Sequence, residues 1–336
     1  MEGCARKVDQ RLLRELDVGE EWRSPCPSPG AMSEADPGRR AARVTTEPGQ
    51  HNSAHRPVVA VVTITLNDPV GIRRTVASVA AQDSADYEHV VVDGGSGPEV
   101  VDWLREWQSA DPERRRLVTD PPRGIYPSMN VGIRRSSAPL VVVVNGGDEL
   151  LPGAIGRVAA HHSAHRWRWA YGGLFVREAD GRPVGNYTPG PFSMARFRAG
   201  LDVVPHGAAY VTRDLYEEIG LYREDIGPSA DQEFFLRAAN VVRPARIPGL
   251  LAVFEMGGTS SQQGGILFRE RDWHRLRLAS GTAFGGRSVT DGIVTAGLLG
   301  FQVARWGTAK ILHTPYPAPI DNTSPIPDED PTPLHR

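Results

Sequence analysis

Short apolar runs rich in valine alternate with longer segments of helical pattern through the first half of the chain. The run from Val58 to Thr65 is followed by Asn-Asp-Pro, which supplies a helix cap and a proline for the first helical turn. A second run, Val90 to Val92, leads into an Asp-Gly-Gly-Ser-Gly loop, and the next helical segment begins at a proline. The pattern predicts repeated units of β-strand, turn and α-helix.

The same alternation continues to the middle of the chain. RRLVTD predicts a third strand, Gly124 to Arg135 a helix, and APLVVVVNGGDEL the most apolar strand of the chain. Continuous valine runs flanked by helices indicate a mainly parallel sheet buried on both faces. We therefore predict an α/β fold, in which ligands bind where the strands end.

The second half of the chain has a less regular pattern. It predicts a strand over WRWAYGGLFV, a loop rich in proline and glycine from Gly185 to Pro191, and helices near RDLYEEIG and ADQEFFLRAAN. The composition of the two ends of the chain predicts where the folded domain begins and ends. Residues 1–56 and the Pro-rich tail 313–336 are predicted to be disordered, residues 57–265 to form the main domain, and residues 266–312 a helical extension.

Charge and cysteine content exclude several classes of protein. The 336 residues include 38 basic and 40 acidic side chains, for a net charge of −2, so a dedicated nucleic-acid-binding role is not expected. Cys4 and Cys26 are the only cysteines, which argues against a disulfide framework or a cysteine-based zinc site. With no signal peptide and no apolar run of about 18 residues, we expect a cytoplasmic protein.

One late segment adds an alternative to a purely cytoplasmic location. DGIVTAGLLGFQVARWGTAKIL combines apolar residues with Arg305, Trp306 and Lys310. Such a helix either packs on the domain or lies on a membrane surface, which would make the protein peripheral at the inner face of the plasma membrane.

Two common nucleotide-binding motifs are absent. The glycines after the second strand do not form G-x-G-x-x-G, and G-x-x-x-x-G-K-[ST] does not occur. An ordered series of other segments is more informative: TITLND, VVVDGGSGPE, GIYPSMNVGIRRSSAPLVVVVNGGDEL, PHGAAYVTRDLYEEIG, SADQEFFLRA and FEMGGTSS. In order and spacing, these segments resemble the blocks of the inverting family 2 glycosyltransferases, from residue 58 to about residue 260.

The resemblance implies a GT-A fold and transfer of a sugar, of the hexosyl type, from a nucleotide-diphosphate donor to an acceptor hydroxyl with inversion. The implied donor is a UDP-, dTDP- or GDP-sugar. The implied acceptor is a sugar, a lipid-linked molecule or a small molecule, in cell-envelope glycan, glycolipid or natural-product glycosylation.

Polar residues at the ends of the first two strands are candidates for binding the nucleotide. Asp93, with its neighbouring glycines and Ser96, can accept hydrogen bonds from a base edge or a ribose hydroxyl, unless it forms an ordinary Asp-Gly turn. Thr65 and Asn67 end the first strand, where the family contacts its nucleotide. Asn67 is alternatively only a helix cap.

The GIYPSMNVG segment resembles the family's GIYDAMNKG, with Pro and Val where Asp and Lys are common. Asn130 is the candidate contact to the donor sugar or nucleotide, whereas Tyr126 and Met129 are predicted core residues. Arg134 is a candidate for binding the diphosphate, with a solvated helix face as the alternative.

Asn145-Gly-Gly-Asp148-Glu149 follows the most apolar strand. In GT-A enzymes this position carries a D-x-D-like motif, whose last acid helps to hold a divalent cation on the donor diphosphate. Mg²⁺ or Mn²⁺ neutralises the charge that develops there, and both ions prefer oxygen ligands. The resemblance implies that Asp148 is the metal ligand. Gly146 replaces the first acid of the motif, which leaves Asp148 as the one aligned carboxylate unless Glu149 turns inward.

Inverting transfer needs a general base for the acceptor hydroxyl. The family supplies it from an acid at the head of a helix, and Asp231 matches that position, with Glu233 as its nearest rival. A cap or first-turn acid, favoured by the helix dipole, is the alternative role for Asp231.

Histidines and two rival functions complete the prediction. His206 matches a family histidine that lines the diphosphate or the acceptor side, with a structural role as the alternative. His161, His162 and His165 have no paired carboxylate pattern, so we expect them to face solvent. The rival functions are a sugar nucleotidyltransferase, which needs a Gly-rich phosphate loop after the first strand, and a non-catalytic protein that retains the fold.

Overall fold

The computed structural model describes residues 57–84, 86–119, 124–257, 266–311 and 323–324, without the side chains of 266–270, 302–311 and 323–324. The predicted leader, 1–56, lies outside the described residues. So does the predicted tail, 313–336, apart from Thr323–Ser324. These two residues form the short strand β10, antiparallel to β7, so the tail is not irregular at that point.

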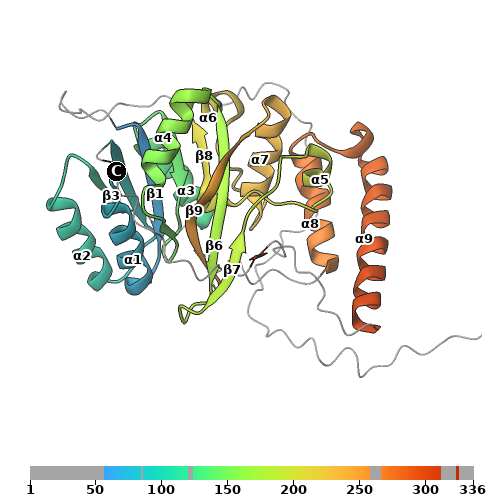
Figure 1. Ribbon diagram of the computed structural model, residues 1–336, viewed down its shortest axis with the longest axis horizontal. Helices are drawn as coiled ribbons and strands as arrows, with labels where there is room; N and C mark the ends of the chain where they lie inside the picture. Colours follow the sequence, from blue (N-terminus) through green and yellow to red (C-terminus); the bar gives the residue numbers. More distant parts are fainter. Residues whose placement is uncertain (1–56, 85, 120–123, 258–265, 312–322, 325–336) are drawn as a thin grey trace, which may run out of the picture. The chain divides into compact units, whose positions relative to one another are not determined.

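The first half of the domain consists of parallel strands joined by helices, as the valine runs predict (Figure 1). The strands are β1 Val59–Thr65, β2 Tyr87–Asp93, β3 Arg115–Thr119 and β4 Leu140–Val143, and the helices are α1 Pro69–Ala80, α2 Pro98–Ser109 and α3 Ile125–Arg135. β1 lies between β2 and β4, all parallel, and Thr65 is in register with Asp93. The carboxyl ends of these strands therefore meet at one edge of the sheet.

The second half makes the sheet mixed. It contains β5 Glu149–Leu150, β6 Trp169–Arg177, β7 Pro183–Tyr187, β8 Ala209–Thr212 and β9 Ala245–Glu255. β8 is antiparallel to β4 and to β6, β7 is antiparallel to β6, and β9 is parallel to β6 and antiparallel to β5. The prediction of a mainly parallel sheet is confirmed for β1 to β4. The loop predicted from Gly185 is wrong at its start, where β7 runs to Tyr187.

Both faces of the sheet are covered, because alternate residues of each strand point to opposite sides. Val62 and Val92 join Ile133 of α3 in one buried cluster, while Val61 joins residues of α1 and of α4 in another. The remaining helices are α4 Ala154–His165, α5 Met194–Arg198, η1 His206–Ala208, α6 Arg213–Ile219, α7 Ala230–Val241, α8 Ile266–Ala279, η3 Phe284–Gly286 and α9 Ser288–Ile311.

Gly132 explains how closely α3 can lie on the sheet. A Cβ at this position would stand only 2.3 Å from Val62 Cγ1, so any larger residue would push the helix away from β1. The glycine of the MNVG segment therefore has a packing role, and it fixes the height of α3 above the strand ends.

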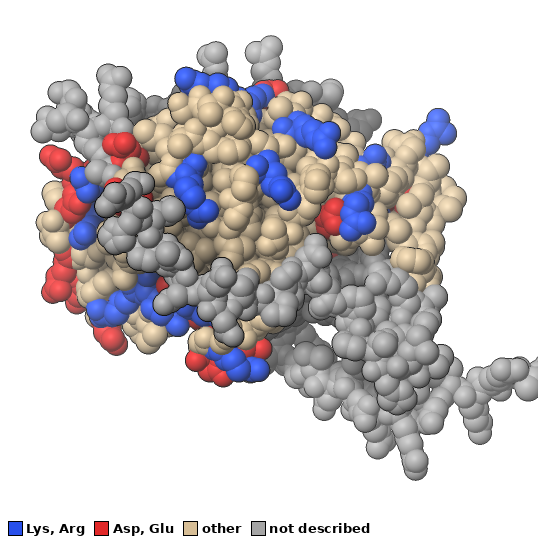
Figure 2. Space-filling view, viewed as in Figure 1, with Lys and Arg blue, Asp and Glu red and all other residues tan. Residues whose placement is uncertain are grey.

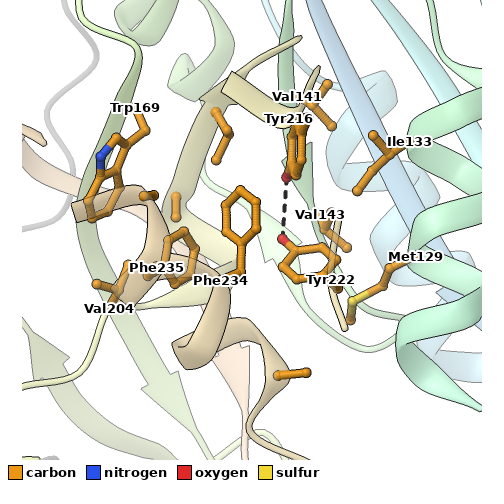
Figure 3. Close-up of a cluster of buried hydrophobic side chains, with 14 of the residues drawn as sticks. Met129, Ile133, Val141, Val143, Trp169, Val204, Tyr216, Tyr222, Phe234 and Phe235 are labelled. Carbon is orange, nitrogen blue, oxygen red and sulfur yellow. Dashed lines mark hydrogen bonds between the residues drawn. The ribbon is translucent and has the colours of Figure 1, made fainter. Parts of the chain in front are cut away.

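Aromatic rings fill the space between the sheet and α7 (Figure 3). Phe234 stacks on Tyr216 at 4.9 Å between centroids, and Phe235 stacks on Trp169 at 5.4 Å. The Tyr216 and Tyr222 hydroxyls lie 3.3 Å apart and form a hydrogen bond within this layer. The cluster holds the amino end of α7 rigidly against the sheet.

The C-terminal extension packs on the domain through α8. Trp273 and Leu276 belong to the same buried cluster as α7, and Figure 1 shows α7, α8 and α9 in succession. α9 is fastened to α8 by Arg277 and Asp291, which are fully buried and 2.8 Å apart. The packed alternative is therefore correct for the inner side of this extension.

The outer side of α9 is apolar. Val289, Ile293 and Phe301 are respectively 75%, 68% and 56% exposed, and they recur at helical spacing along one side of the helix. In Figure 2 the part of α9 not covered by grey atoms is mostly tan, so few charged side chains point outward there. Within the described part of the chain, no helix is long and apolar enough to cross a membrane.

Candidate functional site

A cleft of about 480 Å³ opens at the carboxyl ends of β1, β2 and β4. This is the edge of the sheet at which the sequence pattern places ligands. Its lining comes from the loops after β1, β2, β4 and β9 and from the amino end of α3. The lining residues are Ile64, Thr65, Leu66, Asp68, Gly94, Gly124, Ile125, Ser128, Asn145, Gly146, Gly147, Asp148, Ala179, Phe254, Glu255, Met256 and Gly257.

Asp148 is placed by a tight turn after β4. The turn is closed by a 3.0 Å hydrogen bond from Asp148 N to Asn145 O, and Gly147 has a φ of 99°, which favours glycine. Thr75 of α1 holds this turn in place through two hydrogen bonds. Its hydroxyl oxygen accepts from Gly147 N at 3.0 Å and donates to Asp148 O at 2.6 Å. The clustered glycines after the strand therefore serve to aim one carboxylate.

The Asp148 carboxylate is buried and only partly satisfied. Oδ1 accepts from Glu255 N at 3.0 Å, while Oδ2 has no hydrogen-bond partner among the described residues. Burial raises the pKa of Asp148 to about 7; the Glu255 hydrogen bond opposes this rise, and the nearby Glu255 charge adds to it. The site thus favours either a proton or a cation at this carboxylate.

Two further carboxylates line the cleft, and both are already engaged. Asp68 Oδ1 accepts from Gly71 N at 2.8 Å, so this residue, rather than Asn67, is the cap of α1. Glu255 pairs with Arg74 at 2.6 Å and accepts from Arg177 Nε at 3.2 Å. The lining includes no Lys or Arg among the described residues, although Arg74 and Arg177 offset the charge of Glu255 from outside the lining.

Glu149 does not turn into the cleft as a second ligand. It forms an ion pair with Arg177, whose guanidinium also donates to Gly147 O at 3.3 Å. No group of three or more His, Cys, Asp or Glu side chains within the described residues is arranged to hold a metal ion by itself. Among the described residues of the cleft, Asp148 and Asp68 each keep one carboxylate oxygen without a hydrogen bond, and of the two Asp148 is the buried one.

Asp93 lies at the next strand end and organises its loop. Its Oδ2 accepts from Gly95 N at 3.1 Å and from Ser96 N at 2.9 Å, whereas the buried Oδ1 has no partner. Ser96 Oγ accepts from Asn67 N at 2.7 Å, and Asn67 Oδ1 accepts from Gly97 N at 3.2 Å. The predicted turn role of Asp93 is thus present, and one carboxylate oxygen remains for a ligand.

Two more buried oxygens near the cleft lack partners. They are Thr65 Oγ1 and Asn145 Oδ1, and both residues line the cleft. A buried polar atom without a hydrogen bond is costly unless a ligand or water satisfies it. Together with Asp93 Oδ1, they mark the ends of β1, β2 and β4 as a polar surface suited to a ligand rich in hydrogen-bonding groups.

Asp231 lies in the first turn of α7, with Ser229 at the N-cap position. Its Oδ1 accepts from the Tyr126 hydroxyl at 3.0 Å and its Oδ2 from Gln232 Nε2 at 2.9 Å. Glu233 is fully buried in an ion pair with Arg237 at 2.9 Å, which makes it unsuitable as the rival base. Of the two structural alternatives for Asp231, the N-cap position belongs to Ser229, and Asp231 is a first-turn acid.

His206 is located between the two candidate acids. Its pKa is lowered by burial and raised less strongly by the charge of Asp231. Its Nε2 lies 3.1 Å from the Tyr222 hydroxyl. The adjacent Gly207 approaches Asp148, whose Oδ2 would lie 3.9 Å from a Cβ at that position. A neutral imidazole therefore lies beside both Asp231 and the loop that contacts Asp148.

Two predicted residues lie away from the cleft. Asn130 is buried, with Nδ2 donating to Tyr222 O at 2.8 Å and to Glu224 Oε1 at 3.1 Å, and Oδ1 accepting from Tyr222 N at 3.1 Å. The amide therefore fastens α3 to the loop before α7. Arg134 is exposed at the carboxyl end of α3, whereas the amino end of that helix lines the cleft.

Comparison with known proteins identifies the family. A family model described as Glycosyl transferase family 2 matches residues 60–220. An uncharacterised glycosyltransferase of Mycobacterium tuberculosis is 35% identical over 246 residues, which cover 70% of this chain and 88% of the relative. The chain belongs to glycosyltransferase family 2. It is therefore a transferase, and neither rival function is supported.

Other similar proteins agree with this family 2 assignment. A Mycobacterium bovis protein named PGL/p-HBAD biosynthesis glycosyltransferase is 27% identical over 212 residues, 61% of this chain and 80% of that protein. The crystal structure of S. aureus TarS 1-349 in complex with UDP matches with a TM-score of 0.51 at 15% identity, over 66% of this chain and 64% of that chain, slightly less than two thirds of its length. This likeness shows the GT-A fold.

Sequence reasoning missed several residues of this family 2 site. Tyr126 is buried as predicted, yet its hydroxyl reaches Asp231. Asp68 and Glu255 line the cleft, although only the segments that contain them had been recognised. The rest of the FEMGGTSS segment, residues 258–261, lies outside the described residues. Of the three α4 histidines, His165 is exposed as expected, whereas His161 and His162 are half-buried, and His161 Nδ1 accepts from Trp167 Nε1 at 2.9 Å.

Proposed function

We propose that this enzyme transfers a sugar from a nucleotide-diphosphate donor to an acceptor hydroxyl with inversion of the anomeric carbon. The observation that carries the proposal is the cleft itself, where a buried carboxylate with one available oxygen faces a space lined by acids and by no described Lys or Arg. A cation at Asp148 would offset the repulsion between the cleft acids and an anionic diphosphate. Asp148 is the residue we assign to that cation.

The nucleoside end of the donor is assigned to the polar ends of β1 and β2. Asp93 Oδ1 is a buried acceptor without a donor, which suits a base edge that presents an N–H group, as uracil, thymine and guanine do. Thr65, Asn67 and Ser96 border the same surface. These contacts support UDP-, dTDP- or GDP-sugars as donors and do not distinguish among them.

The residues of the cleft fit Mg²⁺ or Mn²⁺ with most ligands supplied by the donor. Asp148 Oδ2 would hold the ion, and diphosphate oxygens and water would complete an oxygen-rich shell. When bound, the ion supplies charge neutralisation for the departing diphosphate. The amino end of α3, at Gly124 and Ile125, adds the positive end of a helix dipole on the same side of the cleft.

Asp231 is the residue we assign as general base. In the inverting reaction the acceptor oxygen attacks the anomeric carbon from the face opposite the diphosphate, and Asp231 takes the hydroxyl proton. His206 lies beside Asp231 and next to the loop that approaches Asp148, which places it between the acceptor side and the diphosphate side. A neutral imidazole there can accept or donate one hydrogen bond to a sugar or phosphate oxygen.

The acceptor class we propose is a cell-envelope glycan or glycolipid. The similarity to a protein named for PGL/p-HBAD biosynthesis supports a product of this kind. The apolar outer side of α9 supports peripheral contact with a lipid surface, where a lipid-linked acceptor would be found.

The decisive experiment for the base compares Asp231→Asn with the wild-type enzyme in a transfer assay with a panel of nucleotide sugars. Asn fits the site, because its Nδ2 can donate to Tyr126 Oη while the tyrosine proton turns to Pro228 O. We expect turnover to fall by about 10²–10⁴, with donor binding and thermal stability nearly unchanged. Inversion is checked by NMR of the product.

Glu233→Gln is the matched control from the same helix turn. It breaks the buried pair with Arg237, so it should lower the unfolding temperature while the folded fraction keeps its rate. If Asp231→Asn retains turnover within a few-fold of the wild type, the base assignment is wrong.

A further inference from the structure

The Tyr126 hydroxyl has one proton and two acceptors. Pro228 O lies 2.5 Å from Tyr126 Oη, and Asp231 Oδ1 lies 3.0 Å from it. A phenol can donate to only one of them at a time, and rotation of the O–H bond moves the proton from one to the other. Burial raises the pKa of Tyr126 well above its usual range, so the hydroxyl stays protonated and acts as a donor.

The other oxygen of Asp231 is held more rigidly. Gln232 Nε2 donates to Asp231 Oδ2 at 2.9 Å and to Val204 O at 3.0 Å, while Gln232 Oε1 accepts from Val204 N at 3.1 Å. Both ends of this amide are therefore fixed by the backbone before η1. Because Gln232 cannot turn away without breaking two backbone contacts, Oδ2 keeps its donor throughout.

We propose that Tyr126 is the positioning residue for Asp231, and that its two-acceptor hydroxyl makes Oδ1 the oxygen that takes the proton of the acceptor. This inference rests on the proposed role of Asp231 as general base. Before transfer, Tyr126 donates to Oδ1 and orients the ionised carboxylate. As Oδ1 receives a proton, the tyrosine O–H turns to Pro228 O.

The proposed proton transfer to Asp231 does not require Tyr126 to give up its own proton. The acceptor O–H bond breaks and its proton bonds to Asp231 Oδ1, while the acceptor oxygen forms a bond to the anomeric carbon. The bond from that carbon to the diphosphate oxygen breaks, and its electron pair leaves with the nucleoside diphosphate. Tyr126 only exchanges one hydrogen-bond acceptor for another.

The position of Tyr126 also connects the base to the donor cleft. Ile125 and Ser128, on either side of it in α3, line the cleft, while the Tyr126 side chain reaches α7. A donor that contacts the amino end of α3 would therefore also affect the position of Tyr126, which orients Asp231. Apart from Tyr126 itself, the titratable groups that face Asp231 are His206 from η1 and Tyr222 from the loop before α7.

Asp272 of α8 accepts a hydrogen bond from Ser229 Oγ at 2.6 Å. It therefore faces the cap of α7 and not the base. This leaves Tyr126 and Gln232 as the described side chains that donate directly to the Asp231 carboxylate.

Tyr126→Phe tests the inference, with Tyr216→Phe as the matched control. Tyr216 loses a hydroxyl from the same aromatic cluster, where it bonds Tyr222 and does not touch Asp231. For Tyr126→Phe we expect the acidic limb of the kcat profile to move upward by roughly one pH unit, because a hydrogen bond to a charged group has been lost. Donor KM should stay within about two-fold, since the variant keeps the ring that packs beside the cleft.

Tyr216→Phe should leave the acidic limb in place even if the unfolding temperature falls. If Tyr126→Phe gives the wild-type profile while Asp231→Asn is inactive, the Tyr126 inference is overturned and the base remains. If Asp231→Asn is itself active, the base assignment fails instead. Should Tyr126→Phe not fold, 3-fluorotyrosine at position 126, a stronger donor of nearly equal shape, must move the limb to lower pH, and an unmoved limb overturns the inference.

Discussion

Burial disfavours the charged form of the Asp148 carboxylate. The proposed function nevertheless requires this charged form, because only the carboxylate can hold the cation. Its folded-state pKa of about 7 lies above the ordinary value of 3.8. The folded protein therefore holds this proton more tightly than the unfolded chain, so the contribution of Asp148 to stability is full below about pH 4. It is lost as the pH rises towards 7. A ligand cation would offset the cost at neutral pH.

We predict that Asp148→Asn stabilises the metal-free protein at pH 8 and abolishes transfer. The gain should be about 1–4 kcal/mol in the free energy of unfolding and should vanish near pH 4, because the amide carries no charge at either pH. Urea unfolding at both pH values in the presence of EDTA measures it. Asp102→Asn, an exposed acid of α2, is the control and should show no such pH dependence. A variant less stable than the wild type at pH 8 would contradict the buried-charge argument.

At the level of single residues, sequence reasoning located the strand-end acids better than the helix residues. Asp93 and Asp148 follow apolar runs, and a parallel sheet brings such ends together whatever the details of packing. Asn130 and Arg134 lie away from the cleft because their direction depends on the rotation of α3, which Gly132 fixes through contact with Val62. The local sequence pattern cannot reveal the contact between Gly132 and Val62, because these residues are far apart in the sequence.

Among the elements, α8 and α9 depend on one buried ion pair. Arg277 also donates to Arg198 O at 2.8 Å, and Asp291 accepts from Phe284 N at 2.8 Å and lies 2.7 Å from His274 Nδ1. Residues of α5, α8, η3 and α9 thus all contact the buried pair of Arg277 and Asp291. Removing one charge would leave the other buried without its partner.

We predict that Asp291→Asn lowers the free energy of unfolding by about 3–5 kcal/mol, because the Arg277 guanidinium would remain buried without a counter-charge. Thermal and urea unfolding measure the change. Asp225→Asn breaks the exposed pair with Arg223 and serves as the control, with an expected effect below about 1 kcal/mol. A loss from Asp291→Asn as small as that of the control would mean that α9 is held mainly by apolar contacts.

Regular elements were predicted where local pattern and tertiary structure agree. α1, α2, α3 and α7 have clear helical spacing, and β1, β2 and β4 are continuous apolar runs. β7 begins with a proline and contains a glycine, so its sequence looks like a loop, and its pairing with β6 and β10 makes it a strand. β5 has only two residues and exists because β9 lies beside it.

At the scale of the whole molecule, the outer side of α9 is the described surface best suited to a lipid layer. It carries large apolar side chains, and the sequence from residue 292 to residue 320 contains no Asp or Glu. Arg305 and Lys310 supply positive charge in that stretch. Apolar and basic residues together favour anionic membrane surfaces.

We predict that the full chain sediments with anionic vesicles more strongly than with zwitterionic vesicles, and that Ile293→Glu combined with Phe301→Glu weakens this binding at least several-fold. Val70→Glu is the control, because Val70 is an equally exposed apolar residue on α1. Equal binding of the double variant and the control would exclude α9 as the lipid contact.

With the proposed cation at the half-satisfied carboxylate of Asp148, donor binding would also release a proton. Near pH 6.5 most of the metal-free protein keeps a proton on this side chain, and a cation bound to Oδ2 would expel it. Calorimetric titration of metal and nucleotide sugar should therefore give heats that depend on the ionisation enthalpy of the buffer. The dependence should correspond to the release of somewhat less than about one proton at pH 6.5 and fade above pH 8. A fall in pH would then weaken donor capture by this enzyme, because the proton and the proposed cation compete for the same carboxylate.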